Sequence, residues 1–140
     1  MTENPADYDP ANHTRPKRPK STNAEWRTQA ACVTFLRKMQ RYNAWYRDNV
    51  RWIAAQAEGQ RDAKRAAIAK MMGLAPGVAD LLIIIKRPDC LTWIWCELKK
   101  PGGKLSPAQA DWFRWLRDTT VQRHVLYDVQ DFITMIEAQR

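Results

Sequence analysis

The sequence lacks any hydrophobic run long enough to cross a membrane. Its longest aliphatic run, Leu81–Ile85, has five residues, whereas a bilayer-spanning helix needs about 20. The first fourteen residues are polar and contain no apolar stretch of the kind found in signal peptides. We therefore expect a cytoplasmic protein with neither a signal peptide nor a transmembrane segment.

Cysteine and histidine are also scarce. The three cysteines, Cys32, Cys90 and Cys96, are odd in number and widely spaced, so they predict neither a disulfide framework nor a zinc site. Neither histidine has a second histidine or a carboxylate at metal-binding spacing. With 140 residues, 45% of them hydrophobic, the chain is long enough to bury a core of its own.

What the sequence has in excess is positive charge. Lysine and arginine number 23 against 15 acidic residues, which gives a net charge of +8. Residues 25–72 hold ten cations and four anions, whereas residues 73–140 are nearly neutral. Such a balance predicts a polyanionic partner, either nucleic acid or an acidic membrane surface. The seven tryptophans include candidates for stacking on bases.

The patterns predict a flexible basic tail over residues 1–21 and one mixed α/β domain over residues 22–140. The expected helices are a basic amphipathic helix from Thr22 or Asn23 to about Asp48, then Arg61–Met72, Ser106 to about Asp118, and residues 129–138. The expected strands are Val50–Gln56, Leu81–Ile85, Leu91–Leu98 and Val121–Tyr127, the middle two paired as a hairpin. Helical spacing places Trp26, Ala30, Val33, Leu36, Met39, Trp112, Trp115 and Leu116 in the core.

One group of polar residues lies beside the predicted hairpin. Asp80 opens its first strand, and Glu97 and Lys99 end its second. Residues two apart in a strand project to the same face, and the hairpin can bring Asp80 beside them. Two carboxylates and an ammonium are costly to bury without a purpose. A hard divalent cation such as Mg²⁺ binds carboxylates, waters and phosphate oxygens, so it would explain why these groups lie together. A site of this kind can hydrolyse a phosphodiester bond.

The residues around this group resemble a known family. The segments are Gly77-Val-Ala-Asp80-Leu-Leu and the stretch from Glu97-Leu-Lys99-Lys-Pro-Gly-Gly to Gln109-Ala-Asp-Trp112. They are similar to the virus-type replication-repair nuclease (VRR-NUC) domain, a branch of the PD-(D/E)XK superfamily, over roughly residues 23–138. The chain departs from the family at Ala79, where proline is usual.

The resemblance implies a restriction-endonuclease-like core, a mixed central sheet flanked by helices, and a Mg²⁺- or Mn²⁺-dependent nuclease active on DNA. It implies that Asp80 and Glu97 are metal ligands and that Lys99 positions or activates the attacking water. Gln109 matches the family's glutamine after the glycine-rich loop, and Glu25 matches the acidic residue on the first helix.

Two of these residues also have structural explanations. Ser106-x-x-Gln109 and Thr22-x-x-Glu25 both match the capping-box pattern. Gln109 and Glu25 could therefore each cap the N-terminus of the helix on which it lies. Both interpretations of Gln109 and of Glu25 therefore stay open at this point.

Basic residues near the site are the expected DNA contacts, namely Lys100, Lys104, Arg61 and Arg65. The resemblance also implies branched DNA, such as a Holliday junction, as the expected substrate, and a nuclease of this size that cuts two strands gains from acting as a two-fold homodimer. The alternatives are a nicking or flap nuclease that serves a helicase, and a basic DNA-binding module without catalysis.

Overall fold

The computed structural model describes residues 22–54, 71, 73, 75 and 77–140. The predicted tail over residues 1–21 lies outside them, as does nearly all of the predicted helix Arg61–Met72, with Arg61 and Arg65. The helices are α1 (Thr22–Tyr42), α2 (Ala44–Asn49), α4 (Pro107–Trp115) and α5 (Val129–Glu137). The strands are β1 (Val50–Ala54), β2 (Leu81–Lys86), β3 (Leu91–Leu98) and β4 (Gln122–Leu126). No helix in this part of the chain is both long and apolar enough to span a membrane.

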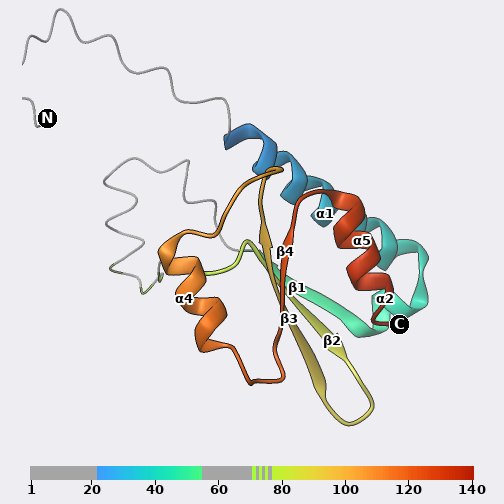
Figure 1. The fold of residues 1–140 in the computed structure, drawn as a ribbon. Helices are drawn as coiled ribbons and strands as arrows, with labels where there is room; N and C mark the ends of the chain where they lie inside the picture. The colour runs from blue at the N-terminus through green and yellow to red at the C-terminus, as the bar shows by residue number, and fades with distance from the viewer. Residues whose placement is uncertain (1–21, 55–70, 72, 74, 76) are drawn as a thin grey trace, which may run out of the picture.

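The four strands form one mixed sheet in the order β1-β2-β3-β4 (Figure 1). β1 pairs with β2 and β2 with β3 in antiparallel fashion, so the predicted hairpin is confirmed. β4 runs parallel to β3, because the chain crosses over through α4 between them, as a parallel connection requires. This sheet with flanking helices confirms the predicted α/β class, a mixed central sheet flanked by helices.

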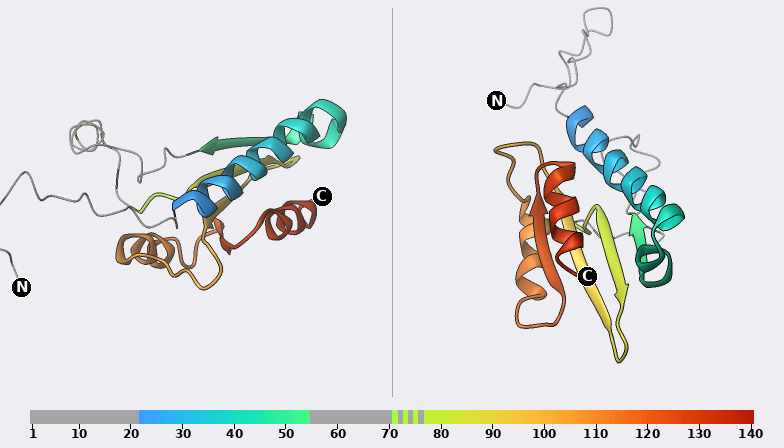
Figure 2. Two further views of the ribbon diagram at one scale, coloured as in Figure 1. Left: turned by 90° about the horizontal axis from the view of Figure 1, so that it is seen from above. Right: turned by 90° about the vertical axis from the view of Figure 1, so that its right-hand side faces the viewer.

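Alternate residues of β3 face two different cores. Ile94, Cys96 and Leu98 are buried in the larger core with α1, α2 and α5, whereas Trp95 packs on the other face against α4. Figure 2 shows α1 and α5 on the sheet from two further directions. Since strand side chains alternate between faces, Glu97 shares the face of Trp95 and points to the α4 side.

The first predicted helix is wrong in one respect, because it is broken at Asn43. Asn43 is extended, and its side chain accepts a hydrogen bond of 3.0 Å from the Trp45 N–H, which starts α2 as a separate helix. The local cap therefore outweighs the continuing helical pattern. The break turns the chain so that β1 can follow α2 along the sheet edge.

Three of the residues predicted to lie in the core are exposed instead. On α1 the buried residues are Cys32 and Leu36, while Trp26 is 53% exposed and Ala30 is also exposed. A helix of 21 residues spans about 32 Å, so its first turns extend beyond the core. Trp115 is 71% exposed, because α4 ends there and Leu116 takes the inward position. Trp115 instead makes an edge contact with Trp112, with ring centroids 5.7 Å apart.

Tyr46 ties α2 to the end of α5. Its ring is fully buried, and its hydroxyl donates a hydrogen bond of 2.5 Å to Glu137 Oε1. That hydrogen bond lowers the pKa of the Glu137 carboxyl. Tyr46→Phe keeps the ring but removes the donor, so we expect a loss of about 1 kcal/mol in the free energy of unfolding at pH 7. Urea denaturation measures it. The difference should vanish as the pH falls through the depressed pKa of Glu137, and a constant difference down to pH 2 would contradict this account.

Candidate active site

The pairing of β2 with β3 sets the two candidate metal ligands opposite one another. Leu81 pairs with Cys96, so the register places Asp80, one residue before β2, across from Glu97. Asp80 Oδ2 accepts a hydrogen bond of 2.8 Å from the Leu98 N–H, which anchors its side chain to β3. Like charges directly opposite in a sheet are destabilising, so this arrangement is unfavourable unless a cation or a proton intervenes.

Glu97 is the most deeply buried ionisable carboxyl of the site, at 1% exposure. Its Oε1 lies 3.3 Å from Lys99 Nζ, and both side chains are shielded from solvent. The same oxygen accepts a hydrogen bond of 2.5 Å from Gln109 Nε2. Its Oε2 is buried without a hydrogen-bond donor among the described residues. One carboxylate oxygen is thus held in place and the other is left available.

Gln109 completes the predicted capping box of α4 and also contacts Glu97. Its Oε1 accepts from the Ser106 N–H at 2.8 Å, and its own N–H donates to Ser106 Oγ at 3.2 Å, which completes the capping box. Its Nε2 donates to Glu97 at the same time. The amide therefore uses its acceptor to start α4 and its donor to orient the buried carboxylate.

Glu25 lies at the edge of this group. Its Oε1 accepts a hydrogen bond of 3.4 Å from the Lys100 N–H, which places the first turns of α1 beside the end of β3. The side chain of Thr22 is outside the described residues, so the predicted capping box at Glu25 is not tested. The side chains of Lys100 and Lys104 are exposed, and Arg61 and Arg65 fall outside the described residues.

Sequence reasoning missed a close contact between Gly77 and α4. Gly77 has φ +81°, and a Cβ built on it would lie 2.5 Å from the carbonyl carbon of Ala108 and 2.8 Å from the Gln109 N. Only a residue without a side chain fits there. The loop that leads to Asp80 is therefore seated on the first turn of α4. The segment Gly77-Val-Ala-Asp80 was recognised as a motif, but nothing local revealed what its glycine touches.

The electrostatics of the site favour a proton or a cation between the carboxylates. Burial raises the pKa of Glu97 to about 8; repulsion from Asp80 adds to this and Lys99 opposes it. Burial also raises the pKa of Asp80, opposed by the hydrogen bond from Leu98. Without a metal, protonated Glu97 can donate to Asp80, which relieves the repulsion between the two groups.

These shifts predict how the stability of the metal-free chain depends on pH. A carboxyl whose pKa is raised on folding stabilises the protein below its unfolded pKa of about 4.5 and loses that contribution as the pH rises through about 8. We expect the free energy of unfolding in EDTA to fall by on the order of 3 kcal/mol between pH 5 and pH 8.5. Urea denaturation across this range measures the fall. Glu97→Gln, which cannot titrate, should remove most of it; an equal fall in that variant would contradict the assignment.

The donor set of the site fits a hard divalent cation. Two carboxylates suffice for Mg²⁺, which usually retains several waters and binds substrate phosphate, and Glu97 Oε2, buried without a hydrogen-bond donor among the described residues, is an oxygen that such an ion could use. No cluster of three or more His, Cys, Asp or Glu side chains suited to a metal occurs among the described residues.

Comparison with known proteins identifies the family. The model of the VRR-NUC domain matches residues 23–130, which include all the site residues described above. No curated protein and no solved structure matches the chain. A match over most of the chain shows more than a local motif, and its end at residue 130 falls within α5. The chain therefore belongs to the VRR-NUC domain family, which implies a nuclease-type function in DNA repair.

Proposed function

We propose that this chain is a Mg²⁺- or Mn²⁺-dependent endodeoxyribonuclease with Asp80, Glu97 and Lys99 at its active site. One observation carries the proposal. A buried carboxylate, Glu97, faces a second carboxylate, keeps one oxygen without a donor, and has an ammonium 3.3 Å from the other oxygen. Hydrolysis adds water across one P–O ester bond and leaves a phosphate monoester and a hydroxyl group.

Each residue has a distinct part in the proposal. Asp80 and Glu97 hold the ion, which when bound supplies Lewis-acid polarisation of a phosphate oxygen and lowers the pKa of water. Lys99 is 13% exposed, so its ammonium can reach substrate while it stays beside Glu97. There it would orient the attacking water and offset the charge that develops on the phosphate. Gln109 is a positioning residue, because it fixes the Glu97 carboxylate from α4.

Substrate and assembly form the finer part of the proposal. The family makes DNA the expected substrate, and we propose branched DNA as the preferred form. One site cuts one strand, so a two-fold homodimer would allow both strands of a junction to be cut. A nicking or flap nuclease acting with a helicase is the alternative arrangement.

A cleavage panel tests the proposal. Supercoiled, duplex, single-stranded, flap and four-way-junction DNA are incubated with the chain in Mg²⁺, in Mn²⁺ and in EDTA. We expect cleavage with either ion and none in EDTA, with the junction cut fastest. A chain that binds all these DNAs but never cuts them would be a binding module, and cleavage that persists in EDTA would exclude a metal-dependent site.

A further inference from the structure

We propose that a hollow at the far end of α1 binds backbone phosphates on an arm of the DNA substrate. We call it the arginine hollow, and it is lined by Arg37, Gln40, Arg41, Arg47, Arg51 and Trp52. The inference rests on the proposed function for DNA as the ligand, and it adds a second contact that the catalytic residues do not make.

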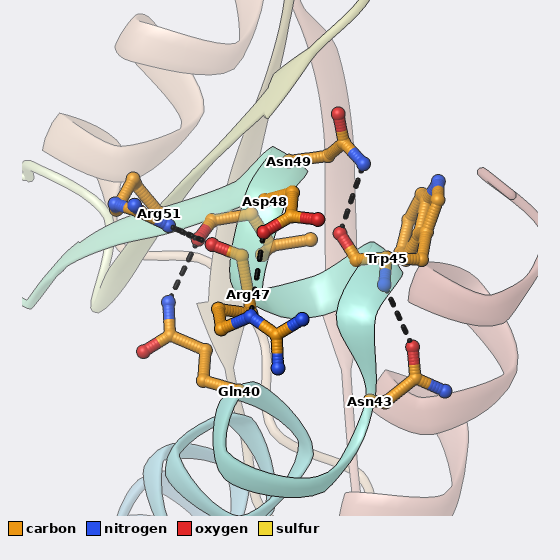
Figure 3. A network of polar contacts seen from close by, with 8 residues as sticks. Gln40, Asn43, Trp45, Arg47, Asp48, Asn49 and Arg51 are labelled. Atoms are coloured by element: carbon orange, nitrogen blue, oxygen red, sulfur yellow. Dashed lines mark hydrogen bonds and ion pairs between the residues drawn. The ribbon is translucent and has the colours of Figure 1, made fainter.

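The hollow has a volume of about 610 Å³ and is built from α1, α2 and β1. A small polar network holds its walls together (Figure 3). Gln40 Nε2 and Arg51 Nη1 both donate to the Val50 carbonyl at 2.8 Å, and Arg51 Nη1 also donates to the Arg47 carbonyl at 2.9 Å. Because these bonds cross between the three elements, the arginines are held on a fixed framework.

The positive charge of the hollow favours the binding of an anion. Four guanidinium groups line it, and residues 26–54 contain six cations but only one acidic residue, Asp48. Asp48 lies 3.4 Å from Arg47, in a pair that is more than half exposed and so neutralises little. Among the described residues, Arg37 and Arg41 have no ion-pair partner. Gathering like charges costs free energy, and the planar guanidinium matches phosphate oxygens in pairs.

The position of the hollow indicates a polymer that also reaches the active site. α1 begins beside the site, where Glu25 accepts from Lys100, and runs to the hollow at its other end. Arg37 and Arg41 follow Glu25 by 12 and 16 residues, which is about 18 and 24 Å along a helix. At about 3.4 Å per base pair, this distance corresponds to roughly five to seven base pairs. The exposed side of α1 between them carries Arg27 and Lys38 and no carboxylate.

The test compares two variants that each remove two positive charges. Arg37→Gln/Arg41→Gln alters the hollow, and Arg114→Gln/Arg117→Gln removes two exposed charges at the end of α4, on the other face of the sheet. Both are made in the full chain with Glu97→Gln, so that binding is measured without cleavage. Fluorescence anisotropy then gives Kd for four-way junctions with arms of four or twelve base pairs over a range of salt concentrations.

We expect the hollow variant to raise Kd for the long-arm junction at least about tenfold at 0.1 M salt and to reduce the salt slope by about 1.8. The short-arm junction should be affected little, and the control variant should bind both as the parent does. An equal loss in the control, or the same loss at both arm lengths, overturns the inference. If the chain with Glu97 intact never cuts, but binding shows this arm-length dependence, the hydrolysis proposal fails and the hollow stands. If that chain cuts and binding is unchanged in the hollow variant, the hollow alone fails.

Discussion

Replacing Glu97 by glutamine is expected to abolish metal-dependent cleavage, with a rate at least about a thousandfold below that of the unaltered chain. Glutamine has almost the same volume, and its Oε1 can still accept from Gln109, so the packing around α4 should survive. The variant loses the negative charge that faces Asp80 and hence one of the two anionic ligands that we propose for the metal ion. Cleavage of supercoiled DNA in Mg²⁺ measures the rate.

The stability of this variant separates chemistry from folding. Because the two carboxylates oppose each other across β2 and β3, removal of one charge should leave the melting temperature at pH 8 unchanged or higher. Functional sites often retain such unfavourable charges at a cost in stability. Asp111→Asn is the matched control, since Asp111 is exposed and, within the part of the chain that the structure describes, forms its ion pair with Arg114 on the surface of α4. Glu97→Gln activity above a tenth of the original rate would remove Glu97 from the site.

The same assay can separate the role of Lys99 from that of the two proposed metal ligands. Lys99→Met keeps the aliphatic stem and removes the ammonium that lies 3.3 Å from Glu97 Oε1. We expect cleavage to fall by on the order of a hundredfold or more. Mg²⁺ bound to Asp80 and Glu97 should raise the melting temperature of the unaltered chain, and we expect it to do so in this variant as well. If the variant instead fails to respond to Mg²⁺, Lys99 serves to hold the carboxylates and not to act on water or phosphate.

Gly77→Ala should destabilise the fold by about 3 kcal/mol or more and lower activity at temperatures where the chain remains folded. The added Cβ would lie 2.5 Å from the Ala108 carbonyl carbon and 2.6 Å from its oxygen, and this backbone belongs to the capped first turn of α4. Either the loop before Asp80 or the start of α4 must move. In both cases the contact of Gln109 with Glu97 is disturbed.

Gly102→Ala is the matched control for backbone strain. Gly102 has φ +78°, close to the +81° of Gly77, but a Cβ there meets nothing within 4 Å. The control should therefore cost only about 1 kcal/mol, the usual penalty for a left-handed residue with a side chain. Urea denaturation of both variants gives the comparison. Equal losses would mean that the close approach to α4 contributes nothing.

Local patterns were sufficient for the elements that carry the site. The strands β2 and β3 are joined by a short turn, so their pairing follows from adjacent sequence, and a period of two puts Glu97 and Lys99 on one face. The Ser106 cap and Pro107 likewise mark the start of α4 from four residues of sequence. For these reasons the hairpin, the α4 capping box and the fold class were all predicted correctly.

Sequence patterns gave wrong predictions where the conformation or burial of a residue depends on elements that are distant in the sequence. The helical period continues through Asn43, yet the side-chain cap there ends the pattern, and the period alone also placed Trp115 inside. Whether a residue on a helical face is buried depends on where the neighbouring element ends, and spacing along one helix holds no information about that.

The sequence by itself determined the chemical groups of the site and the family, because both reside in short segments whose spacing has few structural solutions. Three features were decided only by the tertiary structure. The Gln109 amide both caps α4 and hydrogen-bonds Glu97. The loop at Gly77 packs directly on that helix, and arginines from three elements line one hollow. Each of these depends on contact between segments distant in the chain. Such contacts depend on how the whole domain packs. Local propensity holds no information about that packing.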